Sequence, residues 1–308
     1  MQETRILTQD MFTHVGKNLS EMEAIVRPSM TYWQDAWRRL KQNKVAMLGL
    51  IIIILYTIMA IVGPYMVHYD FRTNDPTYTD KPPSSQHWFG TDTLGRDLWA
   101  RTWMGARVSL MIGFVAAVLN AIIGVIIGVI AGYFGGKVDM FIMRFIDVMY
   151  GIPYLIIVIL VTLVLGTGIM PLIIALIVDG WLGMARLVRG QILQLKEQEF
   201  VLAAKVLGAN HWRIMFRHLI PNTMGVIIVN LTMSVPGAIF TEAFLSFIGL
   251  GVQPPNASWG QLAAYGASSF RSYPWELFIP AFFISTTMLS LNLLGDGLRD
   301  ALDPKLRS

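Results

Sequence analysis

Few residues of this chain are spaced as catalytic groups would be. The sequence GYFGGK at 132–137 resembles a phosphate-binding loop, but the required first glycine falls at Ala131 and Val138 replaces the serine or threonine. The H-E-x-x-H zinc pattern is absent, and no spacing suggests a Ser-His-Asp arrangement. The chain has no cysteine, which excludes disulfides, thiolate metal sites and cysteine nucleophiles. We therefore expect no catalytic residue, no metal ligand and no bound cofactor.

The most unusual polar segment is FVLAAKVLGANHWRIMFRHLIPN at 200–222, which lies between two apolar stretches. A plain surface loop is the simplest interpretation. However, its apolar residues have helical spacing, Ala203 and Ala204 allow close backbone approach, and Gly208 permits a sharp turn. These features favour two short helices joined at 208–210. Rigid helices at a membrane surface are suited to transmitting force from a partner on the same side.

The elements that must position this segment are membrane spans. The chain has 308 residues, of which 54% are hydrophobic and only 14% charged, whereas soluble domains carry about 25% charged residues. A span needs about 20 apolar residues. We predict six spans, with a turn at 134–147 and a Gly-Pro hairpin at 166–171 that divides an apolar run too long for one span. The predicted spans are 46–67, 108–136, 147–166, 170–189, 223–245 and 277–295.

Basic residues orient these spans. The two termini, the 134–147 turn and the 186–222 segment together hold 18 of the 24 lysines and arginines, and the opposite loops hold the other 6. The positive-inside rule then places both termini and the basic segment in the cytoplasm. The basic pI of 9.3 reflects these loops and does not indicate nucleic-acid binding. We expect a multi-pass protein of the bacterial cytoplasmic membrane, in contact with lipid.

Three smaller features complete the predicted architecture. Trp33, Trp37 and Leu40 have helical spacing beside basic residues, which indicates an interfacial elbow helix before the first span. A helix or re-entrant element is expected on the outer face within 254–270, with Ser258 as its cap. Small residues recur every four positions in the second span, which predicts close contact with another helix; they are Gly124, Gly128 and Gly132.

Several of these segments together resemble a known family. The residues Ala203-Ala204, Gly208 and Ile220-Pro221 are similar to the "EAA" loop of ATP-binding-cassette (ABC) importer permeases. Four further motifs resemble the C subunits of oligopeptide and dipeptide permeases, and the resemblance covers about 30–308. They are HWFGTD with GRD at 87–97, FLSFIGLGVQPP at 244–255, SWG at 258–260 and GDGLRDALDP at 295–304.

The resemblance implies an all-α membrane fold of six helices, the type I ABC importer permease fold, with both termini cytoplasmic. The expected domains are an N-terminal segment with the elbow helix (1–45), a first span (46–67), an extracytoplasmic loop (68–106), a five-helix core (107–298) and a tail (299–308). The core includes a coupling loop at 190–222. By resemblance this loop docks on an ATPase, so that ATP is bound and hydrolysed on partner subunits.

The family also implies the partners: a homologous second permease, two ATP-binding subunits, an extracytoplasmic peptide-binding protein and a peptide substrate. In the loop itself, the matching residues are Leu202, Ala203, Ala204, Gly208, Ile220 and Pro221. One of these departs from the pattern, because the family has an acidic residue where this chain has Leu202. Glu197 and Glu199 lie just upstream and are candidates to replace it.

Two carboxylates in or near the spans are candidates for the transport path. An ionisable residue inside a membrane is a functional hypothesis by default. Asp179 could relay protons, contact a substrate amine or have a structural partner, and we favour a structural or cavity-lining role. Arg186 follows it by two helical turns on the same face. Glu242, near the outer end of the fifth span, is the best single candidate to meet a cationic peptide terminus, although a solvated or paired interface residue is the more common role.

Two alternatives remain open at this stage. The same family includes nickel and glutathione importers, and a metal cargo would favour histidines in the path, whereas all five histidines lie outside the predicted spans. A self-contained secondary transporter or channel is the other alternative. Such transporters usually have internal repeats and coupling carboxylates near the midplane, and this chain has no repeat and only Asp179 inside a span.

Overall fold

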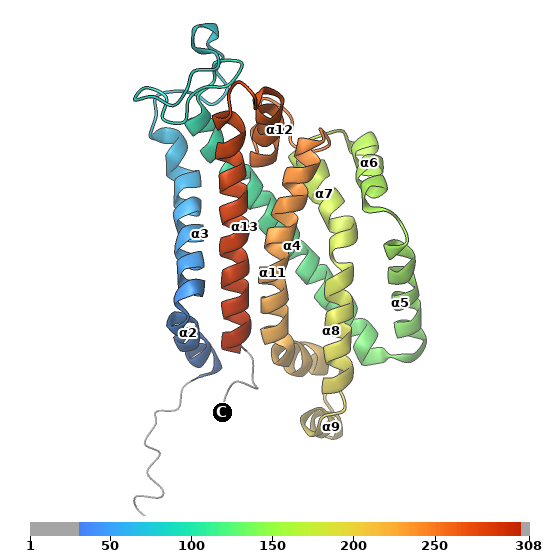
Figure 1. Ribbon diagram of the computed structural model, residues 1–308. Coiled ribbons are helices and arrows are strands. Elements are labelled where there is room, and N and C mark those ends of the chain that lie inside the picture. The colour runs from blue at the N-terminus through green and yellow to red at the C-terminus, as the bar shows by residue number, and fades with distance from the viewer. Residues whose placement is uncertain (1–30, 303–308) are drawn as a thin grey trace, which may run out of the picture.

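The computed structural model describes residues 31–302. All regular elements within this range are helices, and their order is shown in Figure 1. The predicted all-α membrane fold is confirmed. The structure contains α2 (Tyr32–Gln42), α3 (Lys44–Val62), η2 (Gly63–Tyr65), η3 (Pro76–Tyr78), α4 (Leu98–Phe134), α5 (Gly136–Tyr150), α6 (Tyr154–Leu165), α7 (Ile169–Gly180), α8 (Leu182–Leu195), α9 (Glu199–Val206), α10 (His211–Arg213), η4 (Ile214–Leu219), α11 (Ile220–Phe247), α12 (Trp259–Ser269) and α13 (Trp275–Leu302).

Five helical segments of the described chain are long and apolar enough to cross a membrane. They are Lys44–Tyr65, Leu98–Phe134, Ile169–Leu195, His211–Phe247 and Trp275–Leu302. A sixth crossing is possible only if α5 and α6 together form one span, because these two helices are bent by 86°. Five of the six predicted spans therefore correspond to single long segments.

Two predictions are wrong here. Residues 147–166 do not form one continuous helix, and residues 134–147 do not form a turn. Helix α5 fills the supposed turn, and the chain breaks at 151–153 before α6 begins. Pro153 precedes α6 and restricts the residue before it, so the helix cannot pass through. With 12 residues, α6 alone is shorter than the apolar core of a bilayer requires. The Gly166 and Gly168 hairpin is present, and both glycines have positive φ.

The second and fourth spans are longer than predicted. Helix α4 begins ten residues before position 108, because the Asp97 carboxylate caps it by accepting a hydrogen bond from the Ala100 N–H at 2.8 Å. Residues 98–106, which were predicted to belong to the loop at 68–106, are therefore part of α4. Helices α7 and α8 meet at Trp181 and continue to Leu195. Helix α13 also continues to Leu302, so only the rest of the predicted tail lies outside the described residues, as do residues 1–30 of the N-terminal segment.

The predicted small-residue contact in the second span is confirmed, and its partner is α8. A Cβ atom at Gly128 would lie 2.5 Å from the Ala185 carbonyl oxygen, and one at Gly124 would lie 2.6 Å from the Met184 Cβ. At Gly132 the nearest atom would be the Ile192 Cβ at 2.8 Å. Close backbone approach of this kind is typical of small-xxx-small packing between membrane helices, and it seats α8 firmly against α4.

The two ends of the bundle differ (Figure 1). Helices α2 and α9 and the last described residues lie at one end, whereas the 66–97 loop, α6 and α12 lie at the other. The predicted elbow helix is α2, with a Thr31 capping box, a buried Leu40 and exposed Trp33 and Trp37. The predicted outer helix is α12, capped by Ser258 through the Gln261 N–H at 3.2 Å. The positive-inside rule makes the α9 end cytoplasmic.

Candidate functional site

The segment between α8 and α11 forms the two predicted surface elements. Helix α9 ends in a Schellman motif: the Gly208 N–H donates to the Lys205 carbonyl and the Ala209 N–H to the Ala204 carbonyl, both at 3.0 Å. Gly208 has a φ of +79°, a conformation in which a β-branched side chain is strained. The side chain of Asn210 then caps α10 by accepting from the Arg213 N–H at 2.8 Å. The predicted turn at 208–210 is present.

The second element differs from the prediction in one respect. Helix α10, the π-helical segment η4 and α11 follow one another with no non-helical residue between them. It is therefore the first part of the fifth long helix and not a separate helix. A displacement of α10 would be passed along a continuous helical backbone to α11.

One face of this segment is anchored to the bundle. Val201, Ile214, Met215 and Leu219 are almost completely buried and pack with residues of α4 and α8, such as Val188. The Tyr133 hydroxyl and His211 Nδ1 form a hydrogen bond of 2.8 Å between α4 and α10. The coupling segment, defined here as α9 with α10 and η4, is therefore a rigid extension of the bundle.

The opposite face of the coupling segment carries large apolar side chains that nothing in the described chain covers. The exposed fraction is 88% for Val206, 86% for Leu207, 60% for Trp212 and 55% for Phe216. Lys205, Arg213 and Arg217 are exposed beside them. An exposed apolar patch rimmed by charge is typical of a protein contact site. The sequence analysis did not assign these four side chains to a contact surface. The available signal was the presence of four large apolar residues in a segment predicted to lie outside the membrane.

The residues predicted from the "EAA" resemblance do not all lie on this face. Ala203, Gly208 and Pro221 are exposed, whereas Ala204 is buried and Ile220 is half-buried. Leu202, which replaces the acidic residue of the family, is 48% exposed. Glu199 is the first residue of α9 and Glu197 precedes the helix, and both are exposed. Ala204 thus provides the close packing, and Leu202 contributes one more apolar group to the surface.

Of the roles left open for Glu242, the structure shows a paired residue and not a solvated one. It is completely buried in α11, and both of its carboxylate oxygens accept hydrogen bonds: from the Ser109 hydroxyl at 2.7 Å and the Ser246 hydroxyl at 2.8 Å. The Trp259 N–H donates to the Ser109 oxygen at 3.2 Å and thereby includes α12 in the network. This arrangement fits the structural alternative and leaves no edge of the carboxylate free for a peptide terminus.

Asp179 lies half-buried at the end of α7. Arg186, two turns later, does not pair with it: Arg186 forms an ion pair with Asp147 and lies over the Tyr150 ring, with its guanidinium carbon 4.6 Å from the ring centre. Trp181 separates α7 from α8 between the two positions. Within residues 31–302, no hydrogen bond or ion pair joins Asp179 to Glu242 or to the coupling segment.

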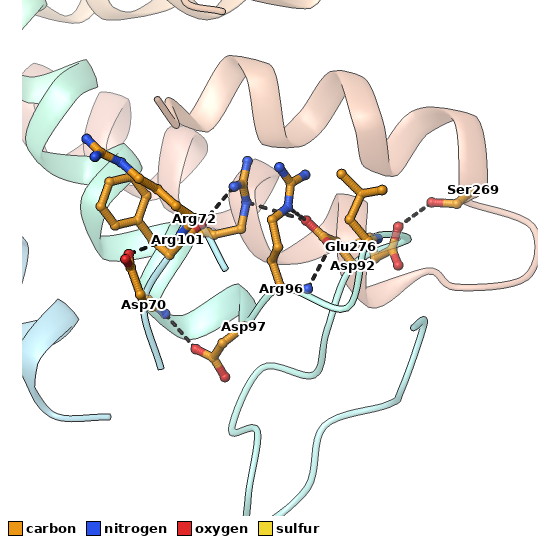
Figure 2. A network of polar contacts seen from close by, with 11 residues as sticks. Asp70, Arg72, Asp92, Arg96, Asp97, Arg101, Ser269 and Glu276 are labelled. Carbon is orange, nitrogen blue, oxygen red and sulfur yellow. Dashed lines mark hydrogen bonds and ion pairs between the residues drawn. The ribbon is translucent and has the colours of Figure 1, made fainter. Parts of the chain in front are cut away.

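A second polar network binds the outer loop to the bundle (Figure 2). Asp92 lies between two arginines: Arg96 Nε donates to its Oδ2 at 2.8 Å, and Arg101 Nε lies 3.5 Å from the same oxygen. Arg101 is completely buried and also donates to the Phe71 carbonyl at 3.0 Å. Nearby, Ser269 of α12 donates to Glu276 of α13 at 2.5 Å. The network fixes the loop on α4 and joins α12 to α13.

Comparisons of this chain with family models and with known proteins all indicate the same family. Residues 124–308 match the binding-protein-dependent transport system inner membrane component, and residues 31–83 match the N-terminal TM domain of oligopeptide transport permease C. The oligopeptide transport system permease protein OppC of Bacillus subtilis (strain 168) is 52% identical over 98% of this chain and 99% of that protein. The dipeptide transport system permease protein DppC of the same strain is 54% identical over 93% of this chain and 90% of that protein.

A more distant relative agrees with this assignment. OppC of Escherichia coli (strain K12) is 44% identical over 94% of this chain and 96% of that protein. The match to a solved amino acid ABC transporter with histidines has 19% identity and a TM-score of 0.47, and it covers 62% of this chain and 89% of that chain. This chain belongs to the binding-protein-dependent transport system inner membrane component family, and its N-terminal part is that of the oligopeptide transport permease C type.

Proposed function

We propose that this chain is one permease subunit of a peptide importer and that the coupling segment links its spans to a cytoplasmic ATPase. As a member of its family, the chain is a multi-pass inner membrane permease without a catalytic site, and ATP is hydrolysed on a separate subunit. The observation that carries the coupling role is the exposed apolar face of Val206, Leu207, Trp212 and Phe216 on a rigid segment.

The same role accounts for the construction of the segment. The buried face keeps α9 and α10 fixed to α4 and α8, and the continuous helix from α10 to α11 gives a mechanical path into the spans. An ATPase that closes on ATP would displace the exposed face, and the long helices would reorient around a cavity between this chain and a second permease. We also propose that residues 107–298 form the core domain, which includes the coupling loop at 190–222. The elbow helix precedes the first span.

The cargo and the other partners follow from the relatives. The relatives reported above are named for oligopeptide or dipeptide transport, which favours a peptide over nickel or glutathione. The complete importer would contain a homologous second permease, two ATP-binding subunits and an extracytoplasmic peptide-binding protein. Specificity would then depend largely on the binding protein, because a peptide backbone offers similar hydrogen-bonding groups whatever its side chains.

Reconstitution tests this function. The chain, its second permease, the ATPases and the binding protein are placed in proteoliposomes, and uptake of a labelled di- or tripeptide is measured. We expect uptake with ATP and none with a non-hydrolysable analogue or without the binding protein. Uptake that continues without ATP and follows an ion gradient instead would indicate a secondary transporter and would contradict the proposal.

A further inference from the structure

The extracytoplasmic loop between η2 and α4 forms a surface cavity of about 410 Å³. The cavity is lined by His68, Tyr69, Asp70, Thr73, Asp75, Tyr78, Gln86, His87, Gly95 and Asp97. Its wall is tightly built: Gly95 has a φ of +72°, and a Cβ atom there would lie 1.8 Å from the Asp75 carbonyl oxygen. The Asp75 N–H also donates to the Leu94 carbonyl at 3.1 Å. The cavity is therefore part of the folded loop.

His87 and Asp97 form a fixed pair in this wall. His87 Nδ1 lies 2.8 Å from Asp97 Oδ2, and the two residues are only 4% and 2% exposed. The contact with the Asp97 carboxylate occupies Nδ1, so Nε2 is the ring nitrogen that remains for a ligand in the cavity. Among the described residues nothing bonds to this Nε2. The His87 ring lies between the rings of Tyr69 and Tyr78, at centroid distances of 4.3 and 5.3 Å.

Two further carboxylates line the cavity, each with one oxygen engaged. Asp70 Oδ1 accepts from the Arg72 N–H at 3.1 Å, and Asp75 Oδ1 accepts from the N–H and hydroxyl of Thr77 at 3.0 and 2.6 Å. The bonds from Thr77 hold the pKa of Asp75 below its usual value, so this carboxyl is ionised at neutral pH. The Oδ2 atoms of both have no partner among the described residues. No lysine or arginine lines the cavity.

The lining thus offers carboxylate oxygens and aromatic rings, and it contains no lysine or arginine. This combination suits an ammonium or guanidinium group, which brings several N–H donors and also interacts favourably with aromatic faces. A metal ion fits less well, because no group of three or more histidine or acidic residues within 31–302 could hold one.

We propose that this cavity receives a lysine or arginine side chain of the extracytoplasmic binding protein. The site rests on the proposed function, because it assumes such a partner. Its location supports that source: the cavity lies in the loop at the end of the molecule opposite α9 (Figure 1), where an external protein first meets the chain. A cargo peptide would arrive enclosed by the binding protein, so its amino terminus is the less suitable ligand.

The test measures ATP hydrolysis by the reconstituted importer as the concentration of peptide-loaded binding protein is raised. The variant is Asp70→Asn with Asp75→Asn. Asparagine retains the Oδ1 acceptor that each local turn uses and removes only the charge. The control is Asp296→Asn with Asp300→Asn, which removes the same charge from exposed positions at the cytoplasmic end. Binding protein loaded with an N-acetylated peptide distinguishes the two sources of the cation.

We expect the variant to need about three- to tenfold more binding protein for half-maximal stimulation at low salt, with basal hydrolysis unchanged and a weaker dependence on salt. An unchanged half-maximal concentration, or an equal change in the control, would overturn the site. If the defect disappears with the acetylated peptide, the cargo amine is the ligand and the assigned source is wrong. If the binding protein does not stimulate the wild type, the proposed function fails first, and this site fails with it.

Discussion

Glu242 shows how a single residue can acquire a different role once its surroundings are known. On the sequence alone, a carboxylate near the outer end of a span is a candidate for substrate contact. In the structure it is completely buried and is the acceptor for Ser109 and Ser246, which in turn accept from the Trp259 and Val252 N–H groups. Each serine oxygen therefore links the carboxylate to a backbone amide. Glu242 holds α4, α11 and the start of α12 in register.

Glu242→Ala should lower the stability of the protein by about 2–4 kcal/mol, because it leaves two buried hydroxyl donors without an acceptor and opens a cavity. Glu242→Gln should cost less, since one acceptor oxygen remains. The melting temperature of the purified protein in mild detergent gives the comparison. Thr241→Ala is the matched control, because Thr241 is only half-buried and its hydroxyl bonds only to the Gly237 carbonyl of its own helix. Normal stability with lost uptake would instead place Glu242 in the transport path.

Gly208 supports a second prediction at the same scale. Valine at a φ of +79° should be strained by about 1–3 kcal/mol, but no atom lies within 4 Å of a Cβ there, so the bundle should remain intact. Gly208→Val should accumulate and assemble, yet lose substrate-stimulated ATP hydrolysis and uptake together. Gly208→Asn is the control, because asparagine tolerates positive φ. Normal transport by the valine variant would show that this turn is not needed for coupling.

At the scale of elements, the glycine row of α4 sets the position of α8 and, through it, of the coupling segment. Gly128→Val should destabilise the protein strongly, since its Cβ would lie 2.5 Å from a backbone carbonyl that cannot move aside. Overpacking of a well-packed core typically costs about 1–3 kcal/mol or more. Gly190→Val in α8 is the control, because nothing lies within 4 Å of a Cβ at that position. Thermal unfolding measures both, and equal stability of the two variants would refute the contact.

The same elements show which features a sequence can predict. Length and apolar content were sufficient for α3, α4, the α7–α8 pair, α11 and α13, because the bilayer imposes a minimum span. Local rules also predicted the Ser258 cap and the turn at Gly208. The α5–α6 bend was missed, because a break at Gly151 and Pro153 divides one apolar run whose total length resembles a span. Ser109 as a partner of Glu242 and Asp147 as a partner of Arg186 were missed for a different reason: they lie on other helices, and no local pattern indicates them.

For the whole molecule, the two ends serve different contacts. The cytoplasmic end presents the apolar face of the coupling segment, and the outer end presents the acidic loop cavity, with the long helices α4, α11 and α13 between them (Figure 1). The coupling segment packs against α4 and α8 at one end, and the outer loop is bonded to α4 at the other. A movement at one end is therefore expected to displace whole helices. This is the property that a subunit needs if hydrolysis on one side of the membrane is to move cargo across it.

Cross-linking from the coupling segment tests this account most directly. The chain has no cysteine, so Val206→Cys or Leu207→Cys introduces a single thiol at a position that is more than four-fifths exposed. The assembled importer is treated with a short thiol-to-amine reagent and its products are identified by mass. We expect a product of this chain with the ATP-binding subunit, in a yield that changes with bound nucleotide. Leu163→Cys in α6, which is 79% exposed, should give none. A coupling-segment thiol that reaches no ATPase, or reaches it no better than the Leu163 control, would contradict the central claim.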